Sequence, residues 1–185
     1  MRRRLLEEIE ETVEAHRSGQ DARIALKMNA LADARCIQGL YEASQAGVRI
    51  DLNVRGVCCL RPGVPGVSEN IRVVSVVGRF LEHSRIYSFQ RGPERRILIG
   101  SADLMPRNLD SRVELVTPVE DETLRGELSH VLEHSLADTT NAWELGADGD
   151  WTRLSPEEEE RRSVQEELQA RHAARAGERV ASTAS

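Results

Sequence analysis

Two kinds of side chain that can hold a phosphoryl group, arginine and histidine, stand at the ends of apolar segments in this sequence. Arg55 follows the apolar segment 48–54 and is itself followed by Gly56. An arginine fork can donate two hydrogen bonds to phosphate oxygens, and a neighbouring glycine leaves the backbone open to a bound anion. The alternative is a solvated surface arginine beside an ordinary turn glycine. From its position alone the solvated arginine is the favoured interpretation, and contact with a phosphate is the alternative that stays open.

His83 lies in the run EHSR, at the start of a predicted strand over residues 84–89. A histidine in this position can stabilise charge on a transferred phosphoryl group or carry a proton at neutral pH. The alternative is a half-buried histidine that is hydrogen-bonded to the backbone. Arg85 lies two residues further on, and residues at this spacing point to the same side of a strand. We therefore expect His83 and Arg85 to point to the same side of that strand.

A dense polar patch follows the next predicted strand, and its members are suited to phosphate or metal contact. For Asp110 and Arg112 a buried salt-bridge network is the favoured interpretation. Lys27 and Asn29, at the end of an earlier strand, are expected to face the same cleft. The patch consists of Ser101, Asp103, Arg107, Asn108, Asp110 and Arg112.

The remaining histidines and the cysteines are predicted to be structural. His130 and His134 have the four-residue spacing of some metal ligands, but no accompanying carboxylate motif, and no metal site is expected in this chain. Cys58 and Cys59 are adjacent, and no activating histidine or helix start lies beside them. The odd cysteine count fits neither a disulfide framework nor a metal site and favours a reducing cytoplasm. Also read as structural or solvent-facing are His16 and His172.

The elements that must position these residues begin with a strand–helix–strand unit. Strands are predicted over residues 23–28 and 48–54, with a helix over 31–46 that ends at Gly47. Short connections make the two strands parallel, with a right-handed crossover. Before this unit, residues 3–17 form an amphipathic helix, for which an exposed patch around Leu5, Ile9 and Val13 is expected. The Pro/Gly loop 61–68 follows the second strand, where ligands tend to bind in open sheets.

Further strands and helices complete one predicted domain, 1–154, and a charged tail, 155–185. The predicted strands cover residues 72–77, 84–89, 96–99 and 112–117, and a hairpin covers 143–154. A helix from Pro118 to about Ala137 buries Leu124, Leu128, Val131, Leu132 and Leu136. Ser155 and Pro156 are predicted to start a surface helix, with a disordered end after Gly177.

Composition narrows the functional classes. The 185-residue chain is 39% hydrophobic and carries a net charge of −6, which argues against nucleic-acid binding by the whole surface. Lysine occurs once, at Lys27, so almost every cation is an arginine. Glutamates interrupt the N-terminal apolar residues, and no apolar run reaches membrane-spanning length. We expect a cytoplasmic protein with no membrane span.

Three blocks of this sequence together resemble a known family. LNVRGVCCLRPGVPGVSENIRV (52–73), GRFLEHSRIYSF (78–89) and ILIGSADLMPRNLD (97–110) resemble, in this order, the last catalytic domain of bacterial polyphosphate kinase, the ATP:polyphosphate phosphotransferase. The resemblance covers about residues 23–151. It implies an α/β, phospholipase D-like domain with a mixed sheet flanked by helices, plus a C-terminal surface helix.

The resemblance also implies a role in reversible phosphoryl transfer from ATP to polyphosphate. In that family the terminal phosphate of ATP passes first to a histidine of a preceding domain, which this chain lacks. Arg55 and His83 resemble the supporting residues that contact ATP phosphates, and His83 is not expected to be the phosphorylated nucleophile. Most Mg²⁺ ligands are expected from the missing domain. The implied partners are polyphosphate, ATP or ADP, and the remaining kinase domains or a homo-oligomer.

Three other interpretations stay open at this point. The chain could be a non-catalytic module that binds polyphosphate or nucleotide phosphates, a self-dimerising phospholipase D-like phosphodiesterase, or a remnant without function. Phosphodiesterases of that kind usually have lysine and asparagine where this chain has Arg85 and Asp103, which weakens the second. The 185 residues alone are not expected to turn over substrate, because a nucleophile and a metal site are missing.

Overall fold

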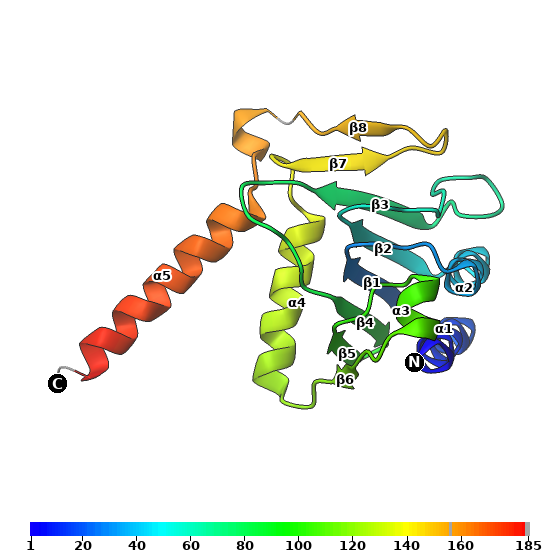
Figure 1. Ribbon diagram of the computed structural model, residues 1–185, viewed down its shortest axis with the longest axis horizontal. Coiled ribbons are helices and arrows are strands. Elements are labelled where there is room, and N and C mark those ends of the chain that lie inside the picture. Colours follow the sequence, from blue (N-terminus) through cyan, green and yellow to red (C-terminus); the bar gives the residue numbers. More distant parts are fainter. Residues whose placement is uncertain (156, 184–185) are drawn as a thin grey trace.

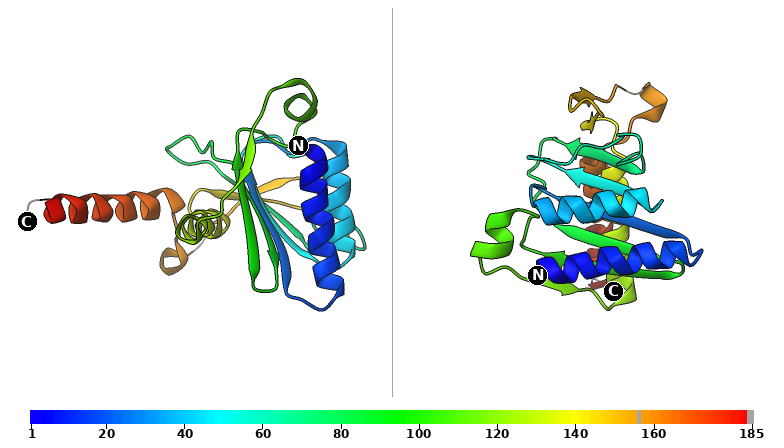
Figure 2. Two further views of the ribbon diagram at one scale, coloured as in Figure 1. Left: turned by 90° about the horizontal axis from the view of Figure 1, so that it is seen from below. Right: turned by 90° about the vertical axis from the view of Figure 1, so that its right-hand side faces the viewer.

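A central sheet of eight strands organises the chain in a computed structural model that describes residues 1–155 and 157–183 (Figure 1). The strand order is β6-β5-β4-β1-β2-β3-β7-β8. Helices α1 and α2 cover one face of the sheet, and α4 covers the other (Figure 2). The predicted α/β class, with a mixed sheet flanked by helices, is confirmed.

The elements have the following bounds. The helices are α1 (Arg2–Arg17), α2 (Ala34–Gln45), α3 (Pro106–Ser111), α4 (Glu122–Leu136), the 3₁₀ turn η1 (Glu158–Glu160) and α5 (Val164–Thr183). The strands are β1 (Ala22–Met28), β2 (Arg49–Val54), β3 (Ile71–Val76), β4 (Ile86–Arg91), β5 (Glu94–Gly100), β6 (Val116–Pro118), β7 (Ala142–Leu145) and β8 (Trp151–Arg153).

The strand–helix–strand unit forms as predicted. β1 runs parallel to β2, with Leu26 opposite Leu52, and β2 runs parallel to β3. The helix expected from Leu31, however, begins at Ala34, where the Asp33 side chain accepts a hydrogen bond from the Cys36 N–H at 3.0 Å. Leu31 instead makes bridges to two neighbouring loops. After α2 the chain turns at Gly47, whose φ of 95° suits glycine.

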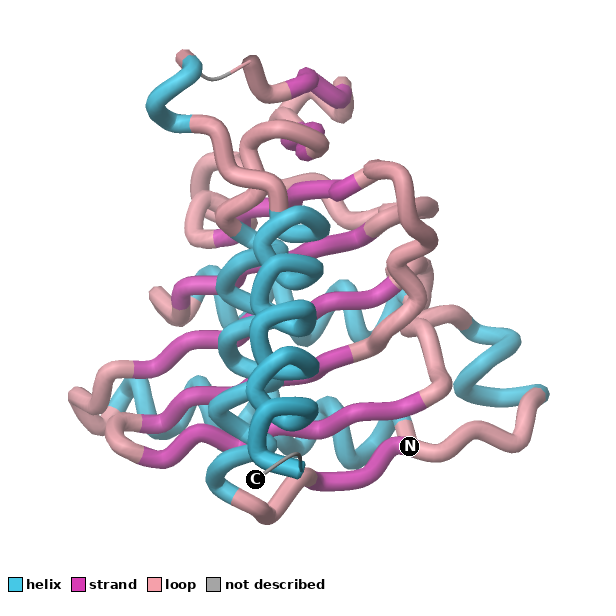
Figure 3. The backbone as a smooth tube through the Cα atoms, turned by 90° about the vertical axis from the view of Figure 1, so that its left-hand side faces the viewer, coloured by secondary structure: helices cyan, strands magenta, loops and turns pink. Residues whose placement is uncertain are grey.

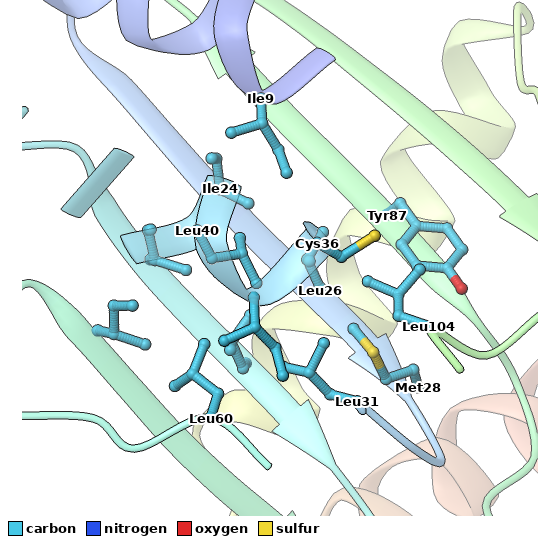
Figure 4. Close-up of a cluster of buried hydrophobic side chains, with 14 of the residues drawn as sticks. Ile9, Ile24, Leu26, Met28, Leu31, Cys36, Leu40, Leu60, Tyr87 and Leu104 are labelled. Atoms are coloured by element: carbon cyan, nitrogen blue, oxygen red, sulfur yellow. The ribbon is translucent and has the colours of Figure 1, made fainter. Parts of the chain in front are cut away.

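The larger core lies between the sheet and the pair α1 and α2 (Figure 4). Ile24, Leu26 and Met28 of β1 point into it, because alternate residues of a strand share one face. The exposed patch expected on α1 is absent: Leu5 and Ile9 are 3% and 5% exposed and pack in this core. A helix with a thin apolar stripe can therefore be covered by its own domain.

The opposite face packs against α4, with Leu132 and Leu136 buried against strand residues such as Val74. Two details of the expected helix were wrong. Pro118 ends β6, and α4 begins at Glu122, where the Asp121 side chain accepts from the Leu124 N–H at 2.9 Å. Leu124 itself is exposed, because it lies in the first turn, beyond the edge of the core.

The strand expected over residues 112–117 shrinks to β6, and residues 106–111 form the unpredicted helix α3. Ahead of β6, the Ser101 N–H donates to the Leu115 carbonyl at 3.0 Å, outside the regular ladder. The alternating pattern of 112–117 thus describes a segment that pairs with β5 only at its end.

The C-terminal region begins with the predicted hairpin, formed by β7 and β8. The helix expected from Ser155 starts later, at Val164, after η1, and Pro156 lies outside the described residues. Val164 packs with Val76 and Ala142, so the sequence after residue 154 still contributes to the core. α5 contacts α4 through Arg171 and Arg175, which bind Glu127, and extends away from the sheet as far as Thr183, past the point where disorder was expected (Figures 1 and 3). Residues 184–185 lie outside the described residues.

No helix in the described part of the chain is both long enough and apolar enough to cross a membrane.

Candidate phosphate site

The candidate residues gather at one end of the central strands, where β1 and β2 end and β4 begins. This region is called the phosphate edge. β1 lies between the other two strands, with Met28 opposite Val54 and Lys27 opposite Ile86. Strands two places apart are separated by about 10 Å. Arg55 and the segment that carries His83 therefore stand on either side of the end of β1.

Arg55 is the half-buried residue that directly follows β2. Its backbone is fixed, because its N–H donates to the Met28 carbonyl at 3.1 Å and its carbonyl accepts from the Ser75 hydroxyl at 3.0 Å. Within the described residues, its guanidinium has no hydrogen-bond partner or ion-pair partner. The next residue, Gly56, lies close to β1, since a Cβ there would be in tight contact with the Asn29 carbonyl oxygen, at 3.0 Å. The site thus holds an arginine whose charge is available to a ligand.

Arg85, by contrast, is neutralised by Asp103. Arg85 Nη2 lies 2.8 Å from Asp103 Oδ2, and Arg85 Nε donates to Asp103 Oδ1 at 3.2 Å. The two side chains are 9% and 11% exposed. This bidentate geometry gives Arg85 a fixed orientation. In the described structure, the guanidinium of Arg85 binds Asp103 and His83 and has little left to offer a ligand.

Asp103 also ties β1 to the loop after β5. Its Oδ1 accepts hydrogen bonds from the backbone N–H groups of Asn29 at 2.7 Å and Ala30 at 3.2 Å. Burial raises the pKa of Asp103, but the hydrogen bonds from Arg85 and Asn29 outweigh it and hold the pKa below its ordinary value. Asp103 is therefore an ionised structural anchor.

His83 is exposed and lies in the segment before β4, not at the start of the strand as expected. The strand begins only at Ile86. Arg85 Nη1 lies 2.8 Å from His83 Nδ1 and donates to the His83 carbonyl oxygen at the same distance. An arginine can only donate, so Nδ1 accepts and the ring proton is on Nε2. His83 and Arg85 therefore do not share the face of a strand as expected, since both precede β4, but their side chains are in direct contact.

Beneath this segment lies Lys27, whose side chain is 3% exposed. Its Nζ pairs with Glu82 Oε2 at 3.0 Å and donates to the Ser84 hydroxyl at 2.9 Å. Lys27 therefore contacts the residues on either side of His83, whereas the shared cleft predicted for Lys27 and Asn29 stays a prediction. Glu82 was not singled out from the sequence, although it precedes His83 in the run EHSR. A charged residue beside a candidate histidine was the only available signal.

The residues of the polar patch after β5 bind different partners and do not form one site. Asp103 faces Arg85, whereas Ser101 and Asn108 both donate to Glu114. Asp110 pairs with Arg2 and lies away from the phosphate edge. The buried network expected for Asp110 and Arg112 is not formed in the described structure, since both residues are exposed and Arg112 has no ion-pair partner there. Arg107 is exposed as well.

The remaining histidines and cysteines lie elsewhere. The rings of His130 and His134 on α4 are tilted against each other with their centroids 3.8 Å apart, and His134 contacts Glu167 of α5. Burial raises the pKa of the Cys58 thiol to about 11, which leaves it a weak nucleophile at neutral pH. Cys36, Cys58 and Cys59 are all free thiols.

The residues that the structure describes do not fit a magnesium site. Glu82 and Asp103, the carboxylates at the phosphate edge, are each engaged with a cation of the same chain. Among residues 1–155 and 157–183 no cluster of three or more His, Cys, Asp and Glu side chains could hold a metal ion. Mg²⁺ prefers several free oxygen ligands, so these two carboxylates give it no site.

The ion pair between Asp103 and Arg85 makes one contribution to stability dependent on pH. An aspartate of an unfolded chain has a pKa of about 3.9, and the pKa of Asp103 in the folded chain is lower. The stabilisation is therefore complete above about pH 3.9 and is lost as the pH falls through the folded-state pKa. We expect the difference in unfolding free energy between the unchanged chain and Asp103→Asn to narrow below about pH 4. Urea unfolding of both proteins at several pH values measures this difference. A difference that stays constant on acidification would contradict the assignment.

Comparison with solved structures first defines the fold class. A nuclease of the phospholipase D family, Nuc from Salmonella typhimurium, superposes with a TM-score of 0.55 at 11% identity, over 78% of this chain and 90% of the nuclease. At this identity the likeness shows the fold alone. The chain is therefore a phospholipase D-like domain in architecture.

The family is shown by closer matches. The family model "Polyphosphate kinase C-terminal domain 2" matches residues 1–165, and the chain belongs to this family. The crystal structure of polyphosphate kinase from Porphyromonas gingivalis superposes with a TM-score of 0.90 at 39% identity, over 95% of this chain and 27% of that one. "Polyphosphate kinase 1" of Chlorobaculum tepidum is 54% identical over 151 residues, which are 82% of this chain and 22% of the relative. Polyphosphate kinase of Streptomyces coelicolor is 47% identical over 166 residues, or 89% of this chain and 22% of the relative. The chain thus spans about a quarter or less of these enzymes.

Proposed function

We propose that this domain contributes to the reversible transfer of the terminal phosphate of ATP to polyphosphate, by supplying the supporting half of an active site. The observation that carries the proposal is the state of Arg55. The other cations at this edge, Lys27 and Arg85, are paired with carboxylates, whereas the Arg55 guanidinium has no partner in the described structure. A half-buried arginine at the end of a parallel strand can grip a phosphate in a bidentate manner.

His83 is proposed to donate a hydrogen bond to the transferred phosphoryl group. Because Arg85 occupies Nδ1, the proton of the ring lies on Nε2, and the exposed side chain can offer this N–H to a phosphate oxygen. A nucleophilic histidine needs a free lone pair directed at phosphorus instead. This geometry supports a role in stabilising negative charge and leaves the nucleophile to another part of the enzyme. The same holds for Mg²⁺, for which the described residues provide no site.

The partners of the reaction are proposals as well. ATP or ADP and polyphosphate are the substrates, and the remaining domains of a polyphosphate kinase, or further copies of this chain, complete the site. Catalysis by the 185 residues alone is not expected, because positioning and charge stabilisation without a nucleophile give little phosphoryl transfer. The cytoplasmic location stays a prediction.

The first test is a calorimetric titration of the chain with inorganic tripolyphosphate and with Mg-ATP. Arg55→Ala and His83→Ala are each expected to weaken binding about tenfold or more, because a hydrogen bond to a charged group contributes about 1.5–3 kcal/mol. Arg49→Ala is the matched control, since Arg49 is an exposed arginine at the opposite end of the same strand. Equal affinity of all four proteins would refute the phosphate site.

The second test separates catalysis from simple binding. This chain replaces the corresponding domain in the polyphosphate kinase of Porphyromonas gingivalis, and synthesis of polyphosphate is measured. We expect the chimaera to be active and its Arg55→Ala and His83→Ala variants to lose most of that activity. A correctly folded chimaera that binds tripolyphosphate but transfers no phosphate would favour the alternative, a non-catalytic phosphate-binding module.

A further inference from the structure

We propose that Gln165, the second residue of α5, is a positioning residue that holds the segment carrying His83 in place for phosphate binding. This proposal deepens the proposed function and rests on it. The segment in question is 77–85, which connects β3 to β4 and passes close to the start of α5 (Figure 1). His83 is exposed on this segment, so beyond its own contact with Arg85 its position depends on the contacts of its neighbours.

The side-chain amide of Gln165 makes three hydrogen bonds to this segment. Its Oε1 accepts from the Phe80 N–H at 3.0 Å, and its Nε2 donates to the Phe80 carbonyl at 2.9 Å and to Glu82 Oε1 at 3.1 Å. Gln165 is only 7% exposed. A primary amide is the neutral group that accepts and donates at once, so it satisfies both backbone groups of Phe80 and still binds a carboxylate.

Glu82 carries the contact onward to the residues on either side of His83. While its Oε1 meets Gln165, its Oε2 pairs with Lys27, which also donates to Ser84. Successive contacts therefore run from Gln165 through Glu82 and Lys27 to Ser84, and they fix the residues on both sides of His83. Gln165 and Lys27 are buried, Glu82 is partly buried and Ser84 is exposed, so the two buried side chains anchor this network from the inside.

Gln165 can act as an anchor because the start of α5 is itself fixed. Val164 is 1% exposed and packs with Val76 and Ala142, and its N–H donates to Asp138 Oδ2 at 2.8 Å. Gly78, at the start of the segment, leaves room for the amide. A Cβ at that position would lie 2.5 Å from Gln165 Oε1.

The decisive variant is Gln165→Glu, because a carboxylate keeps the shape but loses both N–H donors and repels Glu82. Gln169→Glu is the matched control: it adds the same charge to the same helix at an exposed position. In Gln165→Glu we expect faster hydrogen exchange of the Phe80 amide and a shifted NMR signal of the His83 imidazole. Affinity for tripolyphosphate should fall about three- to tenfold, because a mispositioned group retains part of its contribution. The control should change none of these.

Two further variants distinguish positioning from general loss of stability. If Gln165 acts through His83, the double variant Gln165→Glu/His83→Ala should bind tripolyphosphate no more weakly than His83→Ala alone. Gly78→Ala displaces the amide without changing Gln165, and should reproduce the His83 and Phe80 signals of Gln165→Glu. Additive losses in the double variant, or an unchanged His83 signal in Gln165→Glu, would overturn the proposal.

Failure of the proposed function would look different. If the unchanged chain did not bind tripolyphosphate, the phosphate site would be refuted, and with it the functional part of the role of Gln165. The NMR signals would still show whether Gln165 positions the segment. If instead the unchanged chain bound, and Gln165→Glu altered the signals but not the affinity, only the positioning role in binding would be refuted.

Discussion

Replacing Asp103 by alanine is expected to lower the free energy of unfolding by about 3–5 kcal/mol, the usual cost of removing one partner of a buried ion pair. The change leaves Arg85, which is 9% exposed, without a counter-charge. It also removes the acceptor of the Asn29 and Ala30 N–H groups at the end of β1. Urea unfolding followed by circular dichroism measures the loss.

Two comparisons sharpen this test. Asp110→Ala removes an exposed carboxylate that also pairs with an arginine, and should change the unfolding midpoint far less. In the double variant Arg85→Met/Asp103→Leu, an apolar pair replaces both charges, and much of the stability lost in Asp103→Ala should return. A double variant as unstable as the sum of the single changes would show that the charge of Arg85 was not the cause.

Replacing Glu8 by alanine is the second change with a large expected effect, again about 3–5 kcal/mol. Glu8 lies on the inner face of α1, and its side chain is 0% exposed. Arg91 and Arg96 of the sheet, together with Arg4 of α1, surround this carboxylate, with Arg96 Nε 2.6 Å from Oε1 and Arg4 Nη2 2.8 Å from it. Its removal leaves three guanidinium groups beside one another at the contact between helix and sheet.

The matched control is Glu7→Ala. Glu7 is the neighbouring residue of the same helix, is 39% exposed, and pairs with Arg3 and Arg4 at the surface. Surface pairs of this kind contribute about 1 kcal/mol or less. Urea unfolding of both variants gives the comparison. If Glu8→Ala were no more destabilising than Glu7→Ala, the arginines would have to reach solvent without cost, and α1 would not depend on this cluster.

The strand pattern was accessible from the sequence because it is local. Alternation over 48–54 and the short connections on either side of α2 predicted the parallel pair, and the structure contains it. Helix starts were predicted less well. At Asp33 and Asp121 a capping carboxylate determines where the helix begins, whereas the apolar Leu31 and Pro118 predict earlier starts. A capping signal is a single residue and is easily outweighed by an apolar pattern.

The sequence was sufficient to name candidate site residues, but not to tell which of them are paired with each other. Arg55, His83 and Asp103 were recognised from their positions after or before strands and from the resemblance to a family. Which cation is neutralised and which is available depends on contacts across the sheet, such as the pairing of Arg85 with Asp103. Gln165 was missed altogether. Its contact with Phe80 spans 85 residues, and nothing near it in the sequence indicates that partner.

Because Lys27 is the only lysine of the chain, the site carries a built-in chemical reporter. Its amine lies buried under the segment that carries His83, held by Glu82 and Ser84. A reagent that acylates amines can reach it only when this segment lifts away. The rate of labelling at Lys27 therefore measures how often this segment opens, without any substitution or added probe.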